Sequence, residues 1–115
     1  MIPIINLEDK IKEIEKPWSP IEVARVNDQV VRISLLKGEF HWHKHADEDV
    51  LFYVYKGSIT IQLRDQPDIA LHVLTGSQGK GEMAVIPKGV EHRPKSVGPS
   101  YVLLFEPYVL RTRGD

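Results

Sequence analysis

The sequence predicts an all-β protein, a sandwich or closed barrel of short strands with one short helix near its N-terminal end. From residue 21 onward, apolar and polar residues alternate with a period of two, as at Val31, Ile33 and Leu35. This alternation is typical of strands with one buried face. Turn-forming residues separate the runs, for example Asp65-Gln66-Pro67-Asp68. Many short strands and almost no helix favour these two architectures.

The one segment with a helical period lies near the start of the chain. Its apolar residues recur about one turn apart on a single face: Leu7, Ile11 and Ile14. Asn6 is placed to cap the first turn, and Pro17 is expected to end the helix. We therefore expect an N-terminal segment, residues 1–20, that contains this short helix and braces a single barrel domain, residues 21–115.

The barrel domain has recognisable strand runs separated by turns. The clearest are residues 50–55, 59–63, 69–74, 83–86 and 101–105. A turn is expected at Gly38-Glu39, followed by a strand over residues 40–45. The glycine-containing loop at residues 75–81 is longer than a hairpin needs. A lid over the barrel mouth is one use for it, and ordinary loop variation is the other.

Composition excludes several classes of function. The formal net charge of the 115 residues is −1, without a basic run interleaved with aromatics, so we expect no nucleic-acid partner and no attraction to an anionic membrane. The chain has no cysteine, which excludes disulfides, thiolate zinc sites and a cysteine nucleophile. No signal peptide is recognisable, and no apolar stretch approaches the roughly 18 residues of a membrane span. We expect a cytoplasmic, soluble protein.

Three of the five histidines fall within five positions, at His41, His43 and His45. On an extended strand, side chains two residues apart point to one face with a spacing of about 7 Å. Two such imidazoles can converge on one metal ion. The alternative is a run of exposed strand histidines without a ligand role.

A second pattern supports the metal-binding interpretation. Residues 81–86 are expected to form a strand that ends in the turn Pro87-Lys88-Gly89, and His92 follows three residues after the glycine. Proline closes the strand and glycine allows the positive φ of a tight turn. The turn therefore presents His92 at a fixed place.

These two patterns together resemble the motifs of the cupin superfamily. The first motif is matched by Gly38, His43, His45 and Gly57, and the second by Gly81, Pro87, Gly89 and His92. The resemblance covers about residues 21–107. It implies a small single-domain cupin of the conserved-barrel (cupin 2) type, with a double-stranded β-helix or jelly-roll barrel. It also implies a metal ion held by His43, His45 and His92.

The chain departs from the first motif at the glutamate ligand. Six residues before Gly57 the sequence has Val50, and Glu48 and Asp49 stand just before it. We therefore expect a three-histidine site, as some cupin oxygenases use, with Glu48 as the alternative fourth ligand. His41 is expected to be exposed or to lie behind the ligands, and His72 to face solvent.

The missing carboxylate has an electrostatic consequence. Three neutral imidazoles leave two positive charges on a divalent ion, which favours an anionic ligand that binds through two oxygens. All-histidine ligation suits one divalent transition metal ion, namely iron, zinc, nickel or copper. Strand parity places Val50, Phe52 and Val54 on the face of these ligands, so the pocket is expected to be apolar. An apolar face formed by these three residues is equally typical of an ordinary hydrophobic core.

Two classes of function fit this site. One is a metal-dependent enzyme, a dioxygenase or an isomerase, acting on a small anionic or polyol substrate. The other is a module that binds a small molecule without turnover, since one scaffold hosts both uses. The sequence identifies no catalytic acid or base.

We also expect a homodimer, because so small a barrel has open edges to cover. The apolar segments Met1–Ile5 and Tyr108–Leu110 are candidates to cross to a neighbour, and Tyr53 and Tyr55 are candidates to line the contact.

Overall fold

The structure is a computed structural model that describes residues 1–72 and 81–115. Its elements in chain order are α1 (Leu7–Ile11), β1 (Ile21–Val26), β2 (Gln29–Glu39), β3 (Val50–Lys56), β4 (Ser58–Leu63), β5 (Gln66–His72), β6 (Met83–Ile86) and β7 (His92–Pro107). The prediction of an all-β chain with one short helix is confirmed. The end of the expected strand at residues 69–74 and most of the loop at 75–81 lie outside the described residues.

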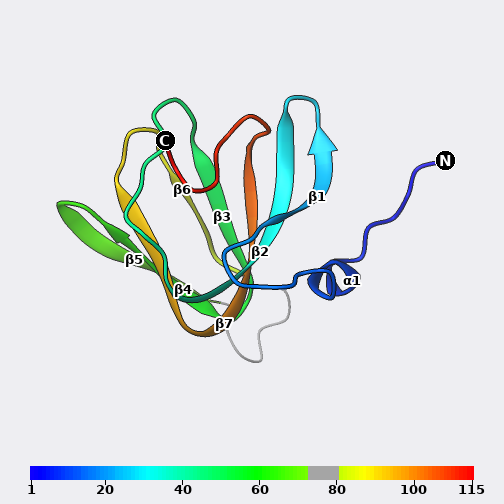
Figure 1. Cartoon of the computed structure of the whole chain (residues 1–115), viewed down its shortest axis with the longest axis horizontal. Coiled ribbons are helices and arrows are strands. Elements are labelled where there is room, and N and C mark those ends of the chain that lie inside the picture. Colours follow the sequence, from blue (N-terminus) through cyan, green and yellow to red (C-terminus); the bar gives the residue numbers. More distant parts are fainter. Residues whose placement is uncertain (73–80) are drawn as a thin grey trace.

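The strands pair antiparallel and curl into a barrel around β7 (Figure 1). The 16 residues of β7 reach both sides of the molecule, because residues 92–95 pair with β4 while residues 100–107 pair with β2. Its second part also pairs with β3. One strand therefore joins the sheet β1-β2-β7-β3-β6 to the β4–β5 hairpin.

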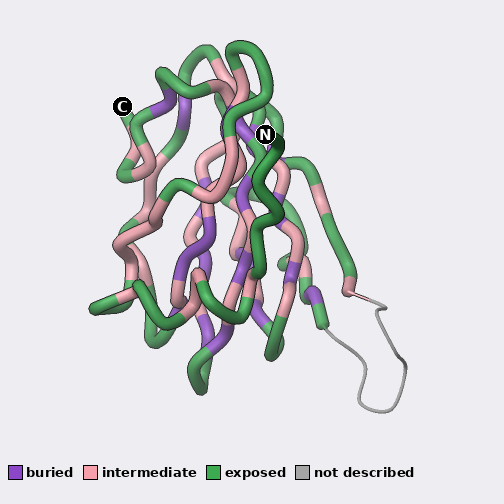
Figure 2. Tube along the Cα trace, turned by 90° about the vertical axis from the view of Figure 1, so that its right-hand side faces the viewer, coloured by how far each residue is buried: buried purple, intermediate pink, exposed green. Residues whose placement is uncertain are grey.

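Buried and half-buried residues alternate along the strands, as the tube coloured by burial shows (Figure 2). On β3 the residues Val50, Phe52 and Val54 are buried and face the barrel interior, as strand parity predicts. They join the apolar core with Ile59 and Ile61 of β4. The face that carries Val50 and Phe52 is also the face of the pocket described below.

The helix is shorter than the apolar spacing predicts, because α1 ends at Ile11. The predicted cap is present, since the side-chain oxygen of Asn6 accepts a hydrogen bond of 3.1 Å from the Asp9 backbone N–H. After Ile11 the hydrogen bonds join residues three apart, since the Glu13 N–H donates to the Lys10 carbonyl at 3.0 Å and the Ile14 N–H to the Ile11 carbonyl at 3.1 Å. No residue of α1 is buried, and a helix without packing is marginal. No helix of the described residues is long and apolar enough to cross a membrane.

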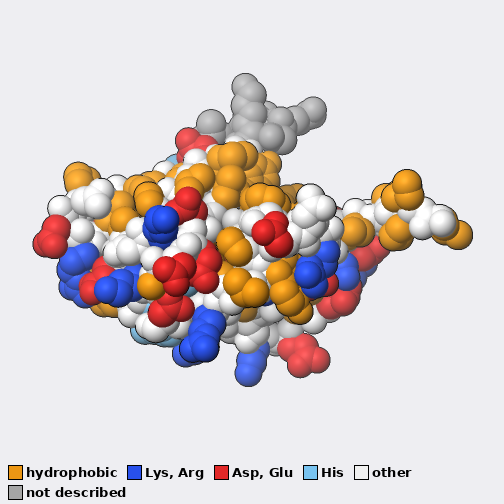
Figure 3. All heavy atoms as spheres, turned by 90° about the horizontal axis from the view of Figure 1, so that it is seen from above, with side chains coloured by type: hydrophobic (Ala, Val, Ile, Leu, Met, Phe, Trp, Pro, Cys, Tyr) orange, Lys and Arg blue, Asp and Glu red, His pale blue; other side chains and the backbone are white. Residues whose placement is uncertain are grey.

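Two of the residues expected to contact a neighbouring subunit make contacts within their own chain. The hydroxyl of Tyr55 donates a 2.9 Å hydrogen bond to Glu8 of α1, and its place in a subunit contact stays a prediction. Leu110 was expected to cross to a neighbour, but it is buried in the core of its own chain. Met1–Ile5 remains exposed and projects as an arm with apolar side chains (Figure 3).

The segment that carries the histidines also differs from its prediction. Instead of turning at Gly38-Glu39, β2 continues to Glu39 through a bulge between Leu36 and Gly38. Gly38 has a φ of +81°, a conformation that glycine adopts without steric cost. Residues 40–49 then form no named strand. An isolated bridge at His43 and a hydrogen bond from the Phe40 N–H to the Pro94 carbonyl, at 3.0 Å, hold them to β7.

Candidate metal centre

Backbone hydrogen bonds bring His43, His45 and His92 together. His43 and His92 form an antiparallel bridge, in which each backbone N–H donates to the carbonyl of the other, at 3.0 and 2.9 Å. The Gly89 N–H donates to the carbonyl of His45 at 2.8 Å, so the turn after β6 is tied to the same segment. The two sequence motifs are thus joined through main-chain contacts.

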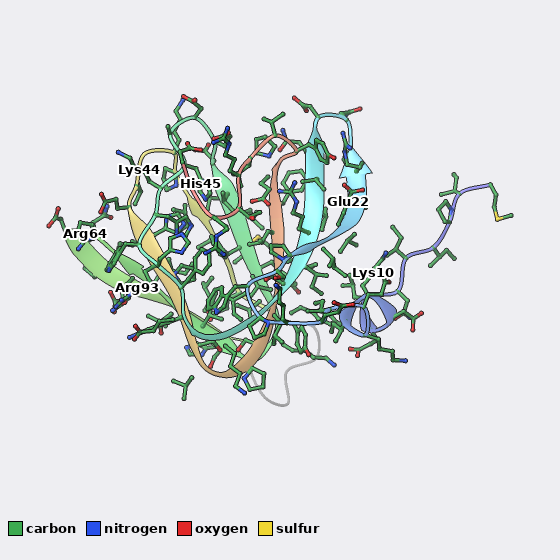
Figure 4. All side chains as sticks on the ribbon, viewed as in Figure 1. Lys10, Glu22, Lys44, His45, Arg64 and Arg93 are labelled. Atoms are coloured by element: carbon green, nitrogen blue, oxygen red, sulfur yellow. The ribbon has the colours of Figure 1, made fainter. Side chains whose placement is uncertain are left out.

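The three imidazoles form one compact group. One ring nitrogen of each histidine lies within 4.8 Å of the corresponding atoms of the other two. Nitrogens that share one ion through bonds of about 2.0–2.1 Å lie at most about 4.2 Å apart, so a small inward shift of the rings is enough for all three to bind one ion. His92 is 1% exposed and His45 is 5% exposed, whereas His43 is half-buried. Figure 4 labels His45 beside Lys44, its exposed neighbour in the chain.

Hydrogen bonds to carbonyl groups set the tautomers of two rings. The Nδ1–H of His43 donates to the His41 carbonyl at 3.0 Å, and the Nδ1–H of His92 donates to the Val90 carbonyl at 2.9 Å. Because a carbonyl only accepts, Nδ1 carries the proton in each ring and Nε2 keeps its lone pair. Nε2 of His92 is buried and has no hydrogen-bond partner among the described residues.

Burial also keeps the group neutral. It lowers the pKa of His43 to about 4 and that of His45 to about 4, and it lowers the pKa of His92 as well. Neutral imidazoles with free lone pairs are the form that binds metal ions. A buried, unpaired Nε2 is costly unless a ligand satisfies it. These residues therefore fit one divalent transition metal ion.

The remaining candidate ligands lie elsewhere. His41 is exposed, and its Nε2–H donates to the Arg113 carbonyl at 2.7 Å. His72 is exposed on β5, as expected. The carboxylate of Glu48 lies outside the three-histidine group, although its Oε2 is buried without a hydrogen-bond partner in the described part of the chain.

A cavity of about 50 Å³ adjoins the histidines. His43 and His45 line it, together with the apolar side chains of Trp18, Leu36, Phe40, Val50, Phe52 and Leu104. Val50 occupies this wall at the place where the glutamate ligand of the motif was expected. Most of the lining is therefore apolar, as predicted. Besides the histidines, the polar side chains that line the cavity are those of Ser34, Thr112 and Glu106, of which Glu106 is the one carboxylate.

Residues 31–106 match the family described as cupin domain. The chain belongs to the cupin family. It is 32% identical over 91 residues to the uncharacterized protein YdbB of Bacillus subtilis (strain 168), covering 79% of this chain and 74% of YdbB. A cupin-2 domain containing protein from Shewanella frigidimarina NCIMB 400 superposes with a TM-score of 0.81 at 40% identity, covering 90% of this chain and 94% of the other.

Other cupin-fold structures are less similar in sequence. Protein NMB1881 from Neisseria meningitidis has a TM-score of 0.78 at 28% identity, with 91% of this chain and 99% of that one covered. Hydroquinone 1,2-dioxygenase from Sphingomonas sp. TTNP3 has a TM-score of 0.75 at 16% identity, covering 87% of this chain and 30% of that one. At such low identity the second likeness shows the fold alone.

Two pocket residues of this cupin were missed in the sequence. Trp18 was assigned to a bracing segment, but its ring stacks on Phe40 with centroids 4.8 Å apart and its Nε1–H donates to the Lys37 carbonyl at 3.0 Å. No sequence pattern marked this contact. Glu106 was detectable, because it continues the buried alternation of Val102 and Leu104 on β7 and places a carboxylate where an apolar residue is expected.

The C-terminal segment forms another wall of the site. Thr112 lines the cavity, and Gly114 lies so close to His43 that a Cβ there would stand 2.6 Å from the histidine Cβ. The Asp115 N–H donates to the Lys44 carbonyl at 3.0 Å, and Asp115 Oδ2 accepts from the Ala46 N–H at 2.6 Å. This segment therefore covers the histidines from a direction that the motifs do not specify.

Proposed function

We propose that this cupin binds one divalent transition metal ion through His43, His45 and His92 and acts on a small anionic or polyol compound. The reaction class we propose is oxygenation or isomerisation. The observation that supports the proposal most strongly is the convergence of three neutral, largely buried imidazoles, of which His92 has an unpaired Nε2. An ordinary core histidine satisfies both ring nitrogens.

The donor set narrows the metal to iron, zinc, nickel or copper, because imidazole suits these ions better than calcium or magnesium. When bound, such an ion supplies Lewis acidity or, in the case of iron, oxygen activation. The chain itself fixes the ring orientations of His43 and His92 through the carbonyls of His41 and Val90. Carbonyl partners of this kind tune ligand basicity as well as geometry.

The charge of the site supports an anionic ligand. Val50 lines the cavity where the family motif has a glutamate, so the ligand set carries no negative charge to balance the ion. A carboxylate or enolate that binds through two oxygens would supply that balance.

The cavity sets the size of the ligand. Its volume of about 50 Å³ is well below the roughly 300–1,000 Å³ of sites for drug-sized molecules. The cavity walls include the apolar side chains of Trp18, Phe40 and Phe52, which would exclude water from the part of the ligand that lies beside the histidines. The ligand we propose is therefore a compact molecule of a few heavy atoms.

We further propose that the protein is a homodimer that pairs through the outer face of β6, β3 and β7. Apolar side chains lie side by side across these strands, since Leu51 pairs with both Val85 and Phe105, and Tyr53 pairs with Met83. Met83 and Val85 are 57% and 53% exposed. An exposed apolar row of this kind is typical of an interaction surface.

Binding and product formation test this function together. The melting temperature of the metal-loaded protein is measured with and without small carboxylates such as oxalate and glycolate, and mixtures are analysed for products by mass spectrometry with and without dioxygen. We expect a ligand-dependent rise that His92→Ala abolishes and His72→Ala, at an exposed histidine, retains. A ligand-dependent rise in melting temperature without any product would mean that the protein binds the small molecule without turnover. An equal rise in His92→Ala contradicts the proposed site.

A further inference from the structure

A buried carboxylate lies in the same cavity as the histidines. Glu106 is on β7, the strand that begins with His92, and its inward direction follows from the buried alternation of Val102, Leu104 and Glu106. The residue is 2% exposed and lines the cavity together with His43 and His45. Glutamate is almost never fully buried unless it is paired or functional.

Arg32 holds this carboxylate in place. Its Nη1 donates to Oε1 of Glu106 at 2.7 Å, while its Nη2 donates to the Tyr108 carbonyl at 3.1 Å, which fixes the guanidinium. Arg32 is the one hydrogen-bond partner that the described residues provide for the carboxylate of Glu106. A carboxylate has about four acceptor positions, so this one can accept further hydrogen bonds.

The buried ion pair between Arg32 and Glu106 is not explained by its contribution to the stability of the fold alone. Replacing a buried ion pair with apolar residues is often neutral or stabilising, because desolvation of both charges offsets their attraction. Burial and the nearby charge of Glu48 raise the pKa of Glu106, and Arg32 opposes the shift. A polar group kept in an apolar cavity beside a candidate metal centre is therefore a candidate for ligand recognition.

We propose that Glu106, positioned by Arg32, accepts a hydrogen bond from the hydroxyl group of a small α-hydroxy acid or α-hydroxy carbonyl compound bound at the group of His43, His45 and His92. This inference rests on the proposed metal site and narrows its ligand class. Such compounds offer two oxygens for chelation, and one of these oxygens carries a proton. A compound that chelates through two oxygens but has no hydroxyl, such as oxalate, cannot donate a hydrogen bond to Glu106. Its negative charge is also repelled by that carboxylate.

Two small probes separate recognition by Glu106 from general damage to the site. Protein loaded with cobalt(II) is titrated with glycolate, which has a hydroxyl, and with oxalate, which has none, after the metal content of each variant has been measured. Glu106→Gln keeps an oxygen that accepts from Arg32 but removes the charge. We expect it to weaken glycolate about 10- to 100-fold, as for a charge-assisted hydrogen bond, and to leave oxalate unchanged or tighter.

Glu22→Gln is the matched control, because Glu22 is an exposed glutamate on β1, away from His45 in Figure 4. It is expected to change neither affinity. If Glu106→Gln misfolds, the double variant Glu106→Gln/Arg32→Gln is used, since it leaves no unpaired buried charge. The same selective loss of glycolate binding is expected.

Different results would contradict the role of Glu106 and the proposed metal-binding function. A fully metal-loaded Glu106→Gln that binds glycolate normally, or that loses both probes equally, overturns the role of Glu106. Metal-loaded wild-type protein that does not bind glycolate overturns the ligand class. Wild-type protein that takes up no metal contradicts the proposed function instead, before either probe is added.

Discussion

The three imidazoles of the candidate metal centre are neutral because the folded chain removes them from water. Burial lowers the pKa of His43 and of His45 to about 4, against a usual value near 6.5. Protons therefore do not compete with a cation at neutral pH, and the carbonyls of His41 and Val90 already orient two of the rings. In the metal-free protein the three imidazoles are therefore already neutral, and two of them are already oriented for binding a cation.

The same shifts predict how the metal-free protein responds to acid. Between pH 6.5 and about 4 the unfolded chain binds protons at His43 and His45 that the folded chain does not bind. The free energy of unfolding should therefore fall as the pH is lowered through this range. Chemical denaturation of metal-free protein between pH 7 and 4.5 measures the slope. A variant with glutamine at both positions should have a shallower slope, and equal slopes would show that these histidines do not carry the effect.

Single residues also show what the sequence could predict. The sequence predicted that His43, His45 and His92 lie together, because two motifs with fixed spacing carry them, and the structure groups the three rings. Their role as metal ligands stays a prediction. Trp18 was not found, because its place in the cavity depends on stacking with Phe40, a contact between segments far apart in the chain. Glu106 was overlooked, although its break in an apolar alternation was visible.

Among the elements, two segments without regular strand structure define the site. Residues 40–49 carry two of the three candidate ligands, His43 and His45. They are tied to β7 by the bridge at His43 and by the hydrogen bond from the Phe40 N–H to the Pro94 carbonyl. The C-terminal segment lies against them, with Gly114 in contact with His43 at a φ of +95°. The strand predicted at residues 40–45 was wrong, because β2 continues through a register shift between Leu36 and Gly38 and its ladder with β7 ends at Glu39. The sequence does not reveal this shift.

The close approach of Gly114 predicts the effect of a single methyl group. Gly114→Ala should displace the C-terminal segment, because its Cβ would stand 2.6 Å from the His43 Cβ and the positive φ disfavours alanine. We expect a loss of about 1–3 kcal/mol in the free energy of unfolding, measured by chemical denaturation.

Gly98→Ala is the matched control, since a Cβ at Gly98 meets no atom within 4 Å. Its stability should remain within about 0.5 kcal/mol of the wild type. Equal effects of the two substitutions would argue against the packing of Gly114 on His43.

At the scale of the whole molecule, the barrel has an apolar inner face and a partly apolar outer one. The alternation of Val50, Phe52 and Val54 on β3 predicted the inner face correctly, because a period of two in apolar residues follows the burial of alternate side chains on a strand. The outer row formed by Val85, Leu51 and Phe105 was not singled out in the sequence. Its members come from three strands and become neighbours only through sheet register.

This outer row predicts the behaviour of the protein in solution. Val85→Glu places a charge within the proposed dimer face and should convert a dimer into a monomer, as measured by light scattering. Val97→Glu is the control, because Val97 is an exposed valine of β7 that pairs with neither β3 nor β4 and lies outside this row. A wild-type protein with the mass of one chain would contradict the dimer, and a dimeric Val85→Glu would exclude this face.

The most direct test of the account is the metal content of untagged protein by mass spectrometry. Wild type is compared with His43→Ala, His92→Ala and the control His72→Ala, at an exposed histidine of β5. We expect about one iron, zinc, nickel or copper ion per chain in wild type and in His72→Ala, and almost none in the other two variants. Wild-type protein that stays metal-free after reconstitution, or variants that retain the full metal content, would contradict it.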